Sequence, residues 1–102
     1  MKIHFILFAA SENEQKQALM TKTVASTFRP VQGDIIDDPG FHSKFHNGYE
    51  VVKVTINYAN EECWVSLSPL ALEVQEIRLQ DYVDKLLIHG WREFSKEEVK
   101  EK

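Results

Sequence analysis

The chain has 102 residues, of which 43% are hydrophobic and 11% aromatic, enough for one domain with its own core. Its formal net charge of −4 and its scattered Lys and Arg residues disfavour nucleic acid as a partner, because that binding needs a basic surface. The single cysteine, Cys63, excludes an internal disulfide and a cysteine-based zinc site. No apolar run approaches the ~20 residues that span a bilayer. Residues 3–10 lead into a polar segment rather than a cleavage site, so we expect a cytoplasmic protein without a membrane partner.

Two strands are predicted in the N-terminal part of the chain. Residues 2–9 are rich in β-branched and aromatic side chains, and residues 20–29 contain four β-branched residues. The polar segment between them, residues 11–18, is interpreted as a loop or one helical turn. We expect the two strands to pair in antiparallel fashion.

An irregular region is predicted after the second strand. A Gly-Asp turn at residues 33–34 leads into a short strand that begins at residues 35–36. Turn signals at residues 39–40 and 47–48 make residues 37–48 the longest irregular stretch in the interior of the chain. Loops of about a dozen residues are often functional, so this loop is a candidate for contacts with a partner.

The middle of the chain predicts a β-hairpin. Residues 49–58 give the strongest strand pattern, residues 62–68 form its partner, and residues 59–61 make the turn. Strict alternation in the first strand places Val52, Val54 and Ile56 on one face and Tyr49, Val51, Lys53 and Thr55 on the other. Residues 70–76 fit either a further short strand or the start of a helix.

One amphipathic helix is predicted over about residues 78–89. Its apolar stripe, spaced at i, i+3, i+4, i+7 and i+8, consists of Leu79, Tyr82, Val83, Leu86 and Leu87. Gly90 provides the left-handed stop, and Trp91 is placed to fold back onto Leu86. Residues 91–94 then add a final strand or simply pack against the domain.

Together these elements predict an α+β fold that is mainly β. We expect a small antiparallel β-barrel or curled sheet of about five or six strands, covered by the C-terminal helix. The chain contains no internal repeat and no Pro/Gly-rich linker, so residues 1–94 are interpreted as a single globular domain. Residues 95–102 have only Val99 to bury, and we expect this charged tail to fray.

The segment FRPVQGDIID, followed by GYEVVKVTINYANEECWVSLSP, resembles the small SH3-like and PUA-like β-barrels. In these barrels a Gly-Asp turn feeds one strand, and a YEVVKV-type strand then forms a hairpin with its partner. The resemblance covers about residues 20–69 and extends to short uncharacterised proteins of prophages and other mobile elements. It implies a small barrel and carries over no ligand-binding or catalytic residue, because a fold alone does not define a function.

Four residues of the predicted loop have metal-ligand chemistry. Oxygen and nitrogen ligands for zinc or another transition metal are present in Asp37, Asp38, His42 and His46. A His-x-x-x-His spacing aligns both rings only on a helix, whereas the turn signals predict a loop, in which such residues are usually solvated. A metal-dependent enzyme at this cluster is therefore the least favoured of three functional hypotheses, and we expect no cofactor.

Aromatic residues form a second candidate site, a surface for a ligand or partner made of Phe41, Phe45, Tyr49, Tyr58 and Trp64. Single-stranded nucleic acids and peptides stack on such side chains in small barrels. A domain of this size also needs bulky side chains for its own interior, so most of the five suit the core better. Phe41 and Phe45 lie in the predicted loop, where exposed aromatic residues mark a partner surface.

The sequence has no nucleophile elbow, phosphate-binding glycine loop, HExxH helix or CxxC pair. We therefore expect a non-enzymatic protein-interaction module. Its contacts, with another protein or with its own copy, are expected at the 37–48 loop and the adjacent strand edges. The alternative is a nucleic-acid-binding or nucleotide-binding barrel that uses Tyr49, Tyr58 and Trp64.

Overall fold

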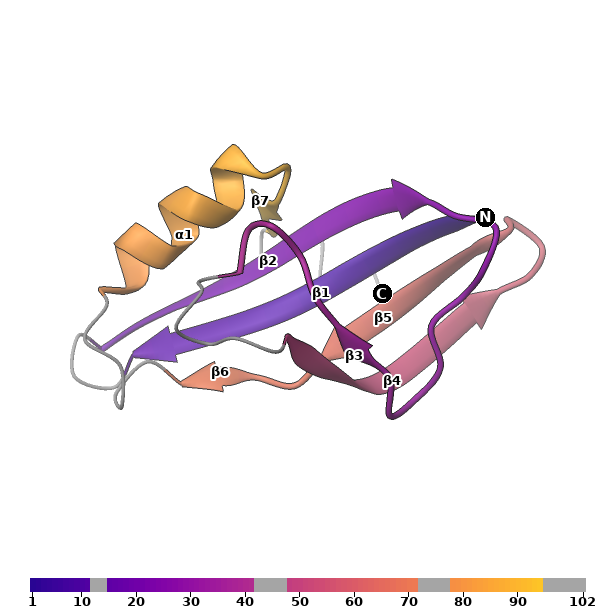
Figure 1. Ribbon diagram of the computed structural model, residues 1–102, viewed down its shortest axis with the longest axis horizontal. Coiled ribbons are helices and arrows are strands. Elements are labelled where there is room, and N and C mark those ends of the chain that lie inside the picture. The colour runs from indigo at the N-terminus through magenta and orange to yellow at the C-terminus, as the bar shows by residue number, and fades with distance from the viewer. Residues whose placement is uncertain (12–14, 42–47, 72–77, 95–102) are drawn as a thin grey trace.

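The computed structural model describes residues 1–11, 15–41, 48–71 and 78–94, which form a curled sheet and a helix (Figure 1). The elements in chain order are β1 (Lys2–Ser11), β2 (Lys16–Ala25), β3 (Ile35–Ile36), β4 (Tyr49–Asn57), β5 (Glu62–Leu67), β6 (Leu70–Ala71), α1 (Leu79–Ile88) and β7 (Arg92–Glu93). The predicted α+β class with mainly β content is confirmed. Within these residues, no helix has the length and apolar character needed to cross a membrane.

The strands follow the order β3-β4-β5-β1-β2-β7, and β6 pairs with the end of β1. Most neighbours are antiparallel, but β1 runs parallel to both β5 and β6. The sheet is therefore mixed, and the antiparallel prediction is wrong for these two pairings. The reason is that the chain crosses the sheet between β2 and β4, which brings β5 alongside β1 in the same direction. Among the described residues the sheet curls without closing, so the curled-sheet form of the prediction is the one observed (Figure 1).

β1 and β2 form the longest pair, from Lys2 opposite Ala25 to Ser11 opposite Lys16. β1 confirms the predicted buried strand, since its alternate residues Ile3, Leu7 and Ala9 are at most 2% exposed. β2 begins at Lys16 and ends at Ala25, so the predicted range of 20–29 is displaced at both ends. Residues 16–18 lack β-branched side chains, and their strand conformation comes from pairing with β1 rather than from local propensity.

β4 contains a bulge that the sequence pattern does not reveal. Val51 and Lys53 pair with consecutive residues of β5, so Val52 is the extra residue. The bulge shifts by one position the residues that point to the core face, which are Val51 before it and Val54 and Ile56 after it. Val52 itself is 43% exposed. The prediction that places Val51 on the face opposite Val54 and Ile56 is therefore wrong.

α1 confirms the predicted helix to within one residue at each end. Its buried residues are Leu79, Tyr82, Val83 and Leu86. The helix ends in a Schellman motif, in which the Trp91 N–H donates to the Leu86 carbonyl at 3.1 Å and the Gly90 N–H donates to the Leu87 carbonyl at 3.3 Å. Gly90 has the left-handed φ of 94° that this motif requires. Trp91 then turns into the core, and β7 forms at the edge of β2 as the final strand.

The helix and the β4–β5 turn lie at opposite ends of the molecule. In Figure 1, α1 lies at the end of the sheet where β1 ends and β2 begins, whereas the β4–β5 turn lies near the N-terminus. The core between the helix and the sheet includes Leu7, Met20, Val65 and Leu86, each fully buried. Cys63 is also 0% exposed, and burial raises the pKa of its thiol, as expected for a structural cysteine.

Two predictions lie partly or wholly outside the described residues. Of the segment 70–76, Leu70–Ala71 form β6, so the strand alternative is confirmed there, and residues 72–76 are not described. The fraying of residues 95–102 stays a prediction, because none of them is described.

Candidate interaction surface

The described start of the predicted loop, residues 37–41, is held in place by the Asp38 carboxylate. Its Oδ1 accepts hydrogen bonds from the Gly40 backbone N–H at 2.8 Å and from the Trp91 indole N–H at 3.0 Å. Its Oδ2 accepts a hydrogen bond from the Lys22 ammonium at 2.8 Å. Burial opposes ionisation of this carboxyl, but the donors outweigh it and lower the pKa of Asp38. We call Asp38, Lys22, Gly40 and Trp91 the Asp38 anchor, because they join the loop to β2 and to the end of α1.

The predicted metal cluster lies only partly within the described residues. Asp37 is exposed, and both oxygens of Asp38 are engaged in the Asp38 anchor. His42 and His46 lie outside the described residues. In the part of the chain that is described, no group of three or more potential metal ligands gathers. The metal site therefore stays a prediction, and Asp38 would have to give up an existing donor to take part in it.

Two of the five predicted surface aromatic residues belong to the core. Phe41 is 6% exposed, and its ring meets Tyr49 edge-to-face at a centroid distance of 4.7 Å. The Lys85 ammonium donates to the Phe41 carbonyl at 3.1 Å and so fixes this residue against α1. The hydroxyls of Tyr49 and Tyr82 are 2.8 Å apart, and burial together with this hydrogen bond raises the pKa of Tyr49 well above its usual range. Neither Phe41 nor Tyr49 offers a surface to a partner.

The other three aromatic residues do not form a common surface among the described residues. Phe45 lies outside them, and Tyr58 is 88% exposed in the β4–β5 turn. Trp64 lies on the face of the sheet opposite the core, where the His4 ring stacks on it at 4.2 Å and the Phe94 ring lies at 5.8 Å. Because protein rings already stack on Trp64, the geometry does not assemble the platform that the nucleotide-binding alternative needs.

The outer face of the sheet carries a polar cluster that the sequence analysis missed. His4 Nδ1 lies 2.7 Å from the Thr23 hydroxyl, and His4 Nε2 lies 3.0 Å from the Glu62 carboxylate. Strand register brings these residues together, because His4 pairs with Thr23 of β2 and with Trp64 of β5. Both ring nitrogens are engaged, so His4 links three strands. The parallel β1–β5 pairing that creates this cluster leaves no local signal in the sequence.

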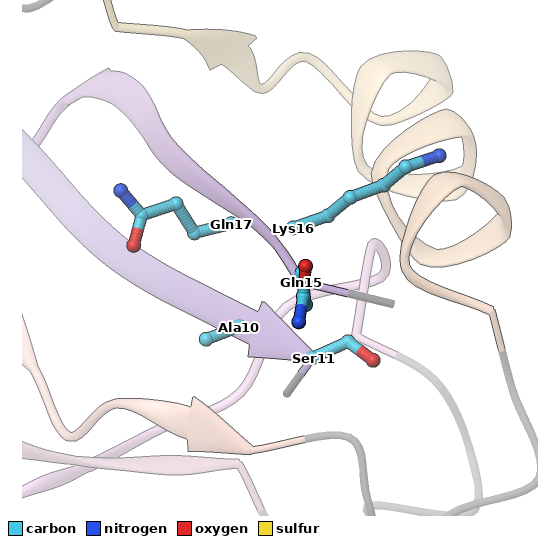
Figure 2. Close-up of a pocket in the computed structure, with 5 residues that line it drawn as sticks. All are labelled: Ala10, Ser11, Gln15, Lys16 and Gln17. Atoms are coloured by element: carbon cyan, nitrogen blue, oxygen red, sulfur yellow. The ribbon is translucent and has the colours of Figure 1, made fainter. Parts of the chain in front are cut away.

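An open depression of about 420 Å³ lies beside the β1–β2 hairpin (Figure 2). Its lining residues are Ala10, Ser11, Gln15, Lys16 and Gln17. In Figure 2 the Lys16 side chain extends toward α1, on the side away from Gln17. Ligand sites of this volume usually have a mostly apolar lining on which a few polar groups converge. Among the described lining residues, the polar groups are the Ser11 hydroxyl, one cation and two amides, and the Lys16 and Gln17 side chains point to different sides (Figure 2).

The outer edge of β4 is the strongest candidate surface. β3 covers it only at Tyr49 and Glu50. The turn before β3 adds two hydrogen bonds at Val51, from the Gly33 N–H at 2.9 Å and to the Asp34 carbonyl at 2.8 Å. No described residue pairs with the outer edge of residues 53–57, which we call the open stretch. Unpaired strand edges are places where another strand can add to a sheet.

Exposed large apolar side chains are frequent in β4 and in the segment that is hydrogen-bonded to it at Val51. Of the ten exposed large hydrophobic residues among those described, six lie in the segments 28–35 and 52–58. We call these six the β4-edge patch, which consists of Phe28, Val31, Ile35, Val52, Ile56 and Tyr58. The hydrogen bonds of Val51 join the two segments at Gly33 and Asp34. Exposed apolar residues concentrated beside an open strand are typical of protein-binding surfaces.

Comparison of the chain with models of protein families, with curated proteins and with solved structures finds no match. The resemblance to SH3-like and PUA-like barrels, and to prophage proteins, therefore stays a prediction. The function has to be argued from the surface itself.

Proposed function

We propose that this protein is a non-enzymatic protein-interaction module that takes up an extended strand at the outer edge of β4. The observation that carries the proposal is the coincidence of the open stretch with the β4-edge patch. The proposal keeps the strand-edge part of the sequence-based expectation. It leaves out the described part of the loop, because Asp38 and Phe41 hold that part in the core.

The backbone of the open stretch supports this mode of binding. In a strand, the face to which a side chain points also fixes the edge to which its N–H and C=O point. Val51 faces the core, and both of its backbone groups bond at the outer edge, to Gly33 and Asp34. Val54 and Ile56 face the core as well, so their backbone groups point to the same outer edge. Each hydrogen bond that an added strand makes there contributes about 1 kcal/mol.

The side chains beside the edge give the surface a preference among partners. Ile56 is 45% exposed and Val31 is 48% exposed, so both still have apolar area that a bound strand can cover. Burying apolar area contributes about 25 cal/mol per Å². In strand addition, the backbone supplies affinity and alternate side chains supply specificity. We therefore expect ligands with apolar residues at alternate positions.

Selection of random displayed peptides on the full chain tests the proposal. Ile56→Pro removes one outward N–H and leaves the β4–β5 hydrogen bonds in place, because the backbone N–H of Ile56 points away from β5. Ile56→Ala is the matched control, since it shortens the same side chain but keeps the N–H. We expect Ile56→Ala to bind the selected peptides somewhat more weakly than the wild type, because apolar area is lost, and Ile56→Pro to bind them about fivefold more weakly than Ile56→Ala, because one hydrogen bond is lost as well.

The same peptides should slow hydrogen exchange of the Val54 and Ile56 amides in the wild type. Failure to select any peptide, or peptides that bind Ile56→Pro as tightly as the wild type, would contradict the proposal. Urea unfolding of both variants serves as the check that each is folded.

A further inference from the structure

The open stretch of β4 is bounded at both ends and has Thr55 at its centre. On one side it is bounded by Val51, whose outer edge is occupied by Gly33 and Asp34. On the other side β4 ends at Asn57, where the chain turns toward β5. Thr55 lies midway through residues 53–57. If two copies pair in antiparallel fashion about Thr55, all of residues 53–57 are paired in both copies. Asn57 of one copy then lies opposite Lys53 of the other, so β4 of each copy ends before it reaches the turn that is bonded to Val51 of the other copy.

This pairing also matches the backbone groups of the two copies. It places Val54 of one copy opposite Ile56 of the other, and the N–H and C=O of both residues point outward. Hydrogen-bonded and non-hydrogen-bonded pairs alternate in antiparallel sheets, so Thr55 meets its counterpart as a non-hydrogen-bonded pair. If the register of the two strands shifts by one residue, outward-pointing backbone groups of one copy meet inward-pointing groups of the other. If it shifts by two residues, either Asn57 of one copy clashes with the turn beside Val51 of the other, or part of the open stretch stays unpaired.

The side chains of the open stretch allow pairing to themselves, with Lys53 as the one that weakens it. Lys53 is the only charged residue in it, and it falls opposite the neutral Asn57 of the other copy. The two Thr55 side chains form a β-branched pair, a favourable cross-strand contact. At each end Val52, 43% exposed, lies opposite Tyr58, 88% exposed. The net charge of −4 on each copy opposes association, so added salt should strengthen it.

We infer that the strand taken up at this edge is β4 of a second copy, paired antiparallel about a two-fold axis at Thr55. The inference rests on the proposed function of the β4 edge and names its partner. Such an interface is isologous and closes at two copies. It is small compared with the interfaces of permanent dimers, so it forms reversibly with concentration.

Cysteine pairing measures this register directly. In a non-hydrogen-bonded antiparallel pair the Cα atoms are about 4.5 Å apart, within the range that a disulfide bridges. Under mild oxidation, Thr55→Cys should form a covalent dimer with twice the 11.9 kDa mass of the chain. The wild type provides the background, because its Cys63 is buried. Lys53→Cys alone should link poorly, whereas a mixture of Lys53→Cys with Asn57→Cys should link well.

Light scattering on the wild type supplies a second readout. Its mass should rise from one chain toward two with concentration, and Ile56→Pro should stay near one chain under the same conditions. A wild-type mass of one chain throughout, or Thr55→Cys linking no faster than Lys53→Cys alone, overturns the inference. If displayed peptides then still bind at the β4 edge, the proposed function stands with a different partner. If they do not, both fail.

Discussion

The two outer sides of the sheet, at β2 and at β4, are protected in different ways. The outer edge of β2 is covered only in its middle, where Met20 and Thr21 pair with β7 and the Phe94 N–H donates to the Leu19 carbonyl, and the Asp38 anchor holds the neighbouring Lys22 side chain. The outer edge of β4 is covered only as far as Val51, and the described residues leave 53–57 open. Both strands are long and belong to one sheet. The difference therefore comes from what packs beside each strand and not from the strands themselves.

One aromatic residue beside each strand illustrates the difference. Trp91, beside β2, is 3% exposed and donates a hydrogen bond to Asp38. Tyr58, at the end of β4, is 88% exposed. Substitutions of the buried Trp91 and its partners beside β2 should therefore change the stability of the fold, whereas substitutions of exposed residues beside the open stretch should change association and leave stability nearly unaltered.

The largest effect is expected from truncating one aromatic residue on each side. Trp91→Ala removes a buried ring and one donor to Asp38, and we expect it to lower the free energy of unfolding by about 3–5 kcal/mol. Tyr58→Ala removes an exposed ring, and a loss below about 0.5 kcal/mol is expected. Urea denaturation measures both values. If the two variants lost similar amounts of unfolding free energy, Trp91 and Tyr58 would contribute equally to the stability of the fold, and the proposed difference between the two sides would be wrong.

Local sequence patterns were sufficient for most of the elements but not for the way the strands pair. The apolar stripe and Gly90 located α1, and the hairpin of β4 and β5 followed from its two strand patterns and the turn between them. The parallel pairing of β1 with β5 was not predictable, because it depends on where distant strands meet. The bulge at Val52 was missed because an extra residue in a strand of mostly β-branched side chains leaves no local trace.

The candidate surface was harder to predict, because residue type alone does not decide burial. Phe41 lies in an irregular segment, yet a hydrogen bond from Lys85 and the nearby Asp38 anchor keep its ring in the core. Tyr58 has the same aromatic character and is exposed. The open stretch was equally hidden, since Lys53 is the only residue of 53–57 that suits an edge strand, and one lysine does not distinguish an edge strand from a central one. That distinction comes from the order of strands in the sheet.

An intermediate effect is expected from Asp38→Asn, which removes the carboxylate of the anchor. Lys22 then keeps its charge in a largely buried position without a counter-ion, and we expect a loss of about 1.5–3 kcal/mol at neutral pH. The pKa of Asp38 is lowered in the folded state, because hydrogen bonds from Lys22 and Trp91 outweigh the effect of burial. Its contribution is therefore complete above the unfolded-state pKa, near 4, and is lost as the pH falls through the folded-state pKa.

Urea denaturation at several pH values checks this prediction. The stability difference between wild type and Asp38→Asn should be largest at neutral pH and should shrink below about pH 4. Asp81→Asn makes the same charge change at an exposed position of α1 and should alter stability by less than about 0.5 kcal/mol. A difference for Asp38→Asn that does not vary with pH would mean that its ionised form does not stabilise the fold.

The smallest effect on stability, within about 0.5 kcal/mol, is expected from Lys53→Thr, because Lys53 is exposed. Its effect on association should be large, since a lysine on an exposed edge is a common obstacle to strand addition. Light scattering should show dimers at a several-fold lower concentration than for the wild type. Lys16→Thr makes the same change at an exposed position of β2 and should leave the mass at each concentration unaltered. If Lys16→Thr promotes association equally, removal of a lysine anywhere on the surface favours pairing, and the open β4 edge has no special role in it.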